Sequence, residues 1–143
     1  MPIVNDGTIS DETALLRIML PGWTCKKGGN TRPQSLAFID GQSGEPSFFI
    51  EQPGVVEAIR KQYPGCVIAR TTAEVVRAAG YAIERRPVES PNFIDNSELH
   101  VIIGPAAPLT SKKELTRMAR KISENESTTI LLPENNPSAR IEH

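Results

Sequence analysis

Residues 66–87 read CVIARTTAEVVRAAGYAIERRP, and this stretch decides the predicted fold because it carries a strand, a capped helix and a second strand in direct succession. The first four residues are apolar and include two β-branched side chains, as in a buried strand. Thr71 and Glu74 form a capping box that begins a short helix, and Gly80 ends it as a left-handed C-cap. The inward-facing residues of this helix are Val75, Val76 and Ala79. Residues 81–87 then alternate as a second strand.

Further elements are predicted on both sides of this unit. A helix is expected over residues 10–20, because Ser10 followed by two acidic residues is typical of a helix start and Pro21 would end it. The polar, glycine-rich residues 23–34 are expected to form an exposed, mobile loop. The remaining predicted helices cover 53–63 and 111–123, and the remaining strands cover 35–40, 46–52, 99–104 and 128–133.

The order of these elements predicts an α+β fold of the α/β type. Strands that follow each other without a helix are expected to pair antiparallel, and strands joined by a helix are expected to be parallel neighbours. The predicted sheet is therefore mixed, with about five to six strands packed by about four helices. A chain of 143 residues is near the common size for one domain. We predict a single domain over residues 1–132 and a flexible polar tail over 133–143.

Composition and charge exclude several classes of function. The chain has 16 Lys and Arg against 17 Asp and Glu, a formal net charge of −1, which argues against a protein that coats nucleic acid. No stretch is apolar enough for a membrane span, and the acidic N-terminus has no signal-peptide pattern. We therefore expect a soluble, cytoplasmic protein without membrane contact. The sequence also lacks the GxxxxGK[ST], GxSxG and HExxH motifs.

Metal and cofactor sites are not indicated. The two cysteines, Cys25 and Cys66, lie in no CxxC pair, and neither is at ligand spacing from His100 or His143. Because an intrinsic zinc site needs about four nitrogen or sulfur ligands, we predict no metal and no cofactor. The sequence leaves open whether the two cysteines form a disulfide.

A candidate site lies where the glycine-rich segment meets the next predicted strand. Arg32 offers a planar fork of donors for a carboxylate or phosphate, and Ser35 can donate and accept hydrogen bonds beside it. The alternative is that Arg32 is solvated or pairs with a nearby acid, while Ser35 satisfies a loop carbonyl. His100, near the start of a strand, is a candidate general acid or base, or else a half-buried histidine bonded to a neighbour.

Five segments follow one another in the chain: LLRIMLPGW, RPQSLAF, PSFF, ARTTAEVVRAAGYAI and HVIIG. In this order they resemble a family of small, uncharacterised bacterial proteins over most of residues 15–122. The resemblance implies a constellation without a known reaction, made of Arg32, Ser35, Ser47, Arg77 and His100. Gln34 stands where a second serine is common in that family, which weakens any role for a serine pair.

The last predicted helix has a basic side. Lys113, Arg117, Arg120 and Lys121 share a face opposite the apolar stripe of this helix. One interpretation is a contact with RNA or phosphate. The other, which we favour at this point, is the solvated side of an amphipathic helix.

Two hypotheses of function follow. The first is a small binding or regulatory accessory module that uses residues 23–35 and the neighbouring sheet edge to hold a protein partner, a second copy of the chain or an anionic ligand. The second is an enzyme acting on a phosphate-bearing substrate, RNA or a nucleotide, with His100 as acid or base, Arg32 stabilising phosphate charge and Ser35 orienting it. Geometry separates them, because the enzyme needs all three side chains within reach of one substrate group.

Overall fold

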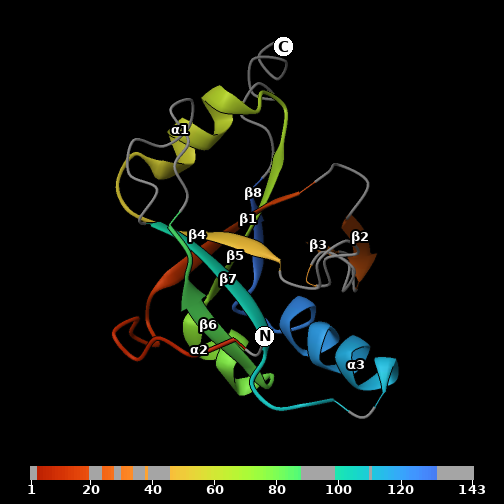
Figure 1. Cartoon of the computed structure of the whole chain (residues 1–143). Helices are drawn as coiled ribbons and strands as arrows, with labels where there is room; N and C mark the ends of the chain where they lie inside the picture. The colour runs from red at the N-terminus through yellow and green to blue at the C-terminus, as the bar shows by residue number, and fades with distance from the viewer. Residues whose placement is uncertain are drawn as a thin grey trace.

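The computed structural model describes residues 3–19, 24–27, 30–33, 38, 46–87, 99–109 and 111–131, with only the backbone for 24–27 and 30–32. Figure 1 shows the elements. In chain order they are β1 (Ala14–Met19), β2 (Thr24–Lys27), β3 (Asn30–Pro33), β4 (Ser47–Ile50), α1 (Val55–Gln62), β5 (Val67–Thr72), α2 (Ala73–Ala78), β6 (Tyr81–Arg85), β7 (His100–Pro105), α3 (Lys112–Ser123) and β8 (Thr129–Leu131). The predicted tail, 133–143, and most of the predicted strand 35–40 lie outside the described residues.

The main sheet has six strands in the order β6-β7-β4-β1-β5-β8, and all of its pairs are antiparallel. The α+β class is confirmed, but the predicted mixed sheet is wrong. Strands joined by a helix do run parallel, yet they are never neighbours. For example, α1 joins β4 and β5, and β1 lies between them and pairs antiparallel with both.

The helix predicted over residues 10–20 is the strand β1, so the described residues form three helices rather than about four. Leu15 and Leu16 point to opposite faces of the sheet, and both are 0% exposed. A strand buried on both faces has a continuous apolar run, which periodicity cannot separate from a short buried helix. Ser10 is not an N-cap, because its carbonyl accepts from the Thr13 amide in a turn and its hydroxyl contacts the Thr13 hydroxyl.

The segment predicted as a loop over residues 23–34 contains the two-stranded sheet β2–β3. The register pairs Lys27 with Asn30 across the turn and Cys25 with Arg32 further along. Two glycines stand between the strands in the sequence, a composition that two-residue hairpin turns favour. The prediction missed this hairpin because its strands have no apolar alternation. β3 contacts β8 at the edge of the main sheet.

The stretch 66–87 folds as predicted, with a shift of one residue at the helix cap. Thr72, not Thr71, caps α2, and its hydroxyl accepts a hydrogen bond from the Val75 amide at 3.3 Å. Thr71 is buried instead, and its hydroxyl contacts that of Thr128 at 2.8 Å. Gly80 adopts the predicted left-handed conformation, with φ +107°.

Helices α2 and α3 contact each other, and α1 lies apart from them (Figure 1). A Cβ placed on Gly80 would lie 3.2 Å from the terminal carbon of Met118, so the end of α2 passes closely beneath α3. In the buried core the rings of Phe38 and Phe48 stack with centroids 6.0 Å apart. No helix of the described ranges is long and apolar enough to cross a membrane.

Candidate functional site

The predicted junction between Arg32 and Ser35 is described only in part. The backbone of Arg32 lies in β3, opposite Cys25, and Ser35 lies outside the described residues. Arg32 therefore belongs to the two-stranded sheet, whereas His100 belongs to the six-stranded one. The structure does not bring a described Arg32 side chain to His100, and the enzyme hypothesis gains nothing from this pair.

His100 begins β7 and is only 8% exposed. Its Nδ1 lies 2.6 Å from the carbonyl oxygen of Arg86. Since a carbonyl can only accept, Nδ1 carries the proton of this hydrogen bond. The ring also packs edge-on against Phe49, with centroids 5.3 Å apart. The imidazole is thus held by one backbone bond and one aromatic contact, which leaves only Nε2 for proton transfer.

Among the described residues of the predicted site, the strand register places Ser47 near His100. β4 and β7 pair antiparallel with Ser47 opposite Ile102 and Phe49 opposite His100. Because side chains alternate along strands, Ser47 and His100 share a face at diagonal positions. The carbonyl of Ser47 accepts a hydrogen bond from Arg17 Nη1 at 3.0 Å. This arrangement fits a structural role for both residues as well as a site.

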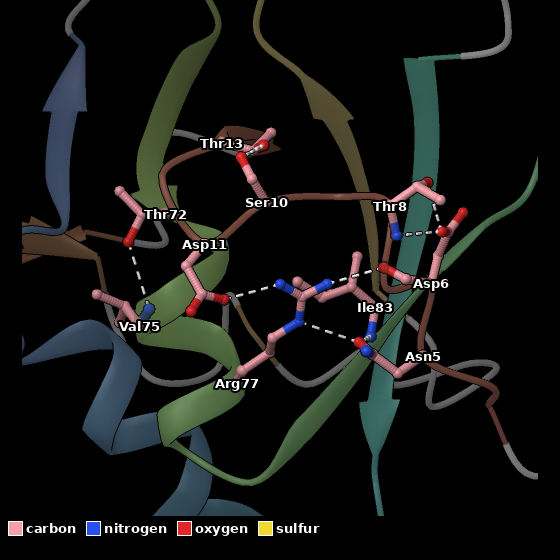
Figure 2. A network of polar contacts seen from close by, with 10 residues as sticks. All are labelled: Asn5, Asp6, Thr8, Ser10, Asp11, Thr13, Thr72, Val75, Arg77 and Ile83. Atoms are coloured by element: carbon pink, nitrogen blue, oxygen red, sulfur yellow. Dashed lines mark hydrogen bonds and ion pairs between the residues drawn. The ribbon is translucent and has the colours of Figure 1, made fainter.

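Arg77 is the centre of a polar network between α2 and the N-terminal segment (Figure 2). Its Nε donates to Asn5 Oδ1 at 3.0 Å, one terminal nitrogen pairs with the Asp11 carboxylate at 2.8 Å, and the other donates to the Asp6 carbonyl at 2.9 Å. All three guanidinium nitrogens are therefore engaged within the chain. The geometry gives Arg77 a structural function, and its ligand role remains a sequence-based prediction.

The basic side of α3 forms a groove, which we call the α3 groove. A cavity of about 380 Å³ is lined by Lys112, Lys113, Thr116, Arg117 and Arg120. The spacing of these residues places them on one side of the helix, and the buried residues Met118, Ala119 and Ile122 occupy the other. The predicted residues Lys113, Arg117 and Arg120 are brought together here, whereas Lys121 does not line the cavity.

The α3 groove has a strongly uneven charge. Of the five described residues that line it, four are cationic and none is acidic. Among the described residues, no carboxylate forms an ion pair with any of the four. Thr116 uses its hydroxyl to donate to the Lys112 carbonyl, so that proton is not available to a ligand. Lys112, one of the cations of this predicted helix, was not placed on the shared face, and Thr116 was not predicted. Residues 112, 116 and 120 are nevertheless spaced four apart, which is the usual signal for one helix face.

Metal ligands and thiols give no alternative site in the described parts of the chain. No group of three or more His, Cys, Asp or Glu side chains there could hold a metal ion. Cys66 is a free, buried thiol, which answers the open question of a disulfide to Cys25. Burial raises the pKa of the Cys66 thiol, so the reactive thiolate is disfavoured.

Comparison with protein-family models, curated proteins and solved structures finds no match for this chain. The resemblance to small bacterial proteins therefore transfers no residue role.

Proposed function

We propose that the protein is a binding module for a small phosphate-bearing ligand, which it holds in the α3 groove. The observation that carries this proposal is the convergence of Lys112, Lys113, Arg117 and Arg120 on one cavity, with no carboxylate among the described lining residues. Like charges held side by side repel one another, and an anion in the groove relieves that repulsion. Guanidinium groups bind phosphate through two parallel hydrogen bonds, and ammonium groups add point charges.

The size of the groove favours a ligand with few phosphates. From Lys112 to Arg120 the helix rises eight residues, roughly 12 Å, which spans two or three linked phosphate groups. The whole chain has a net charge of −1, so its field does not attract a long polyanion over a wide surface. A local site for an oligophosphate or a nucleotide fits both facts. The proposal assigns no reaction, because His100 does not line the α3 groove.

Calorimetric titration with inorganic tripolyphosphate tests this proposal. We expect saturable binding to the unmodified chain that weakens as salt rises, because ion pairing with exposed cations is screened. The double substitution Arg117→Gln and Arg120→Gln should weaken binding at least tenfold. A matched control, Lys61→Gln with Lys121→Gln, removes the same charge from exposed positions outside the groove and should change binding less than about twofold.

Two outcomes would overturn the proposal. Absence of binding at millimolar tripolyphosphate would remove the ligand, and equal weakening in both double variants would show a net-charge effect without a groove. A short single-stranded RNA serves as a second probe. If it bound much more tightly than tripolyphosphate, with a steep salt dependence, a nucleic-acid contact would replace the small-ligand proposal.

A further inference from the structure

A second cavity, of about 620 Å³, lies between α1 and the main sheet, and we call it the α1 cavity. The strands contribute Ala14 of β1, Arg70 of β5 and Leu131 of β8. The chain just after β4 contributes Glu51. Helix α1 and its N-cap contribute Gly54, Val56, Glu57 and Arg60. A volume in this range is typical of sites for small molecules.

The small side chain of Ala14 leaves space in the α1 cavity beside two longer lining side chains, Glu51 and Arg70. Ala14 of β1 is opposite Glu51, whose amide donates to the Ala14 carbonyl at 2.9 Å. On the other side of β1, Arg70 pairs with Leu16 in the register and reaches back across the strand. Glu51 and Arg70 meet over β1 in a two-pronged ion pair of 2.8 and 2.6 Å. A larger side chain at position 14 would fill the space between this ion pair and α1.

The ion pair holds Arg70 at the cavity and leaves one of its terminal nitrogens available to a ligand. Glu51 occupies Nε and one terminal nitrogen of Arg70, and the other terminal nitrogen makes no hydrogen bond with any described residue. The side chains of Arg70 and Glu51 are 39% and 23% exposed, so the pair is open to a ligand. Arg70 can therefore donate to a carboxylate while Glu51 holds its orientation.

Helix α1 supplies charges of both signs to the same cavity. Arg60 is cationic and Glu57, one turn earlier, is anionic. Gly54, the N-cap residue, has no side chain to cap the helix, so it offers no side-chain acceptor to the amides of Val56 and Glu57. These amides add donors for an anionic group near Arg70. Val56 and Leu131 add apolar surface.

We propose that the α1 cavity binds a small zwitterion of amino-acid to dipeptide size. Its carboxylate is held by Arg70 and Arg60, its ammonium group by Glu57, and its apolar part by Val56 and Leu131. The paired charges of the described lining residues carry this assignment, because two cations and two carboxylates give this part of the lining no net charge. A purely anionic or purely cationic ligand would leave one sign unmatched. This site is separate from the α3 groove and does not depend on it.

Nuclear magnetic resonance titration with the dipeptide L-leucylglycine tests the proposal. We expect saturable shifts of the amides of Gly54, Val56 and Glu57. The N-acetylated dipeptide lacks the ammonium group and the dipeptide amide lacks the carboxylate, and each should bind at least tenfold more weakly. Absence of saturable shifts with any of the three probes would overturn the proposal, and so would equal binding of all three.

Substitutions locate the site. Ala14→Leu fills the cavity without changing charge and should abolish the shifts, whereas Ala78→Leu adds the same volume at an exposed position of α2 and should not. Glu57→Gln, at an exposed position that folding should tolerate, keeps the variant testable if Ala14→Leu fails to fold. It should lower binding of L-leucylglycine to the level of the acetylated probe. Binding unchanged by Glu57→Gln would exclude this role for Glu57.

Discussion

At the scale of single residues, Gly104 leaves room for the N-terminal segment to pack against the main sheet. A Cβ at position 104 would lie 2.6 Å from the terminal carbon of Ile3, a distance that real contacts do not reach. Ile3 belongs to a small buried cluster with Ala82 and Ile102. The absent side chain at position 104 therefore allows Ile3 to cover this part of the sheet.

Gly104→Ala should destabilise the chain by about 1 to 2 kcal/mol, because an added methyl forces Ile3 out of its place. Chemical unfolding followed by circular dichroism measures the change. Gly7→Ala is the matched control, since nothing lies within 4 Å of a Cβ at Gly7, and it should cost little. Adding Ile3→Ala to Gly104→Ala should recover part of the loss. If the losses in unfolding free energy of Gly104→Ala and Ile3→Ala were simply additive, the contact with Ile3 would not be the cause of the destabilisation.

At the scale of elements, residues 3–13 fasten α2 to the edge strand β6. The Ile83 amide donates to Asn5 Oδ1 at 3.1 Å, and the Ile83 carbonyl accepts from the Asp6 amide at 2.7 Å. Exposed edges of sheets invite pairing with other chains, and this segment occupies the edge of β6. Arg77 joins the same segment to α2 through three hydrogen bonds (Figure 2).

Arg77→Lys should release the N-terminal segment even though it keeps the charge. An ammonium group cannot reproduce the planar fork that contacts three partners, and charge-assisted hydrogen bonds are worth about 1.5 to 3 kcal/mol each. Hydrogen exchange should become faster at the amides of Asp6 and Ile83, while the β5 amides stay protected. Arg117→Lys, in the α3 groove, is the control and should leave both amides unchanged. Unchanged exchange in Arg77→Lys would mean that packing alone holds the segment.

Local patterns predicted the elements whose signals are local. Helices α1, α2 and α3 were found because each has an apolar stripe, and Gly80 marks the end of α2. β1 was misassigned because both of its faces are buried, so Leu15 and Leu16 read as a helix face. Helical spacing predicted three of the five described residues that line the α3 groove, namely Lys113, Arg117 and Arg120. The α1 cavity could not be predicted, because it requires Glu51 and Arg70 to meet across β1, and nothing local encodes that pairing.

At the scale of the whole molecule, the strand order explains why the chain needs its long connections. Each helix joins two parallel strands that are separated by at least one other strand, so every helix crosses part of the sheet. The order therefore depends on contacts between distant segments, and sequence spacing alone suggested parallel neighbours. The N-terminal segment closes this arrangement at the outer edge of β6, opposite the edge formed by β8.

At acid pH the N-terminal segment should detach from the edge of β6 before the sheet unfolds. Hydrogen bonds from Thr8, together with the positive charge of Arg85, hold the pKa of Asp6 below its ordinary value. Hydrogen bonds from the Val4 amide and from Arg86 lower the pKa of Glu84 in the same way. A carboxyl group whose pKa is lower in the folded chain than in the unfolded chain stabilises the fold at pH values above its unfolded pKa, about 4. This stabilisation is lost as the pH falls through the pKa of the folded state. The melting temperature should therefore fall between about pH 5 and 3, and less steeply in Asp6→Asn with Glu84→Gln. An equal slope in wild type and double variant would assign the acid sensitivity to other carboxylates.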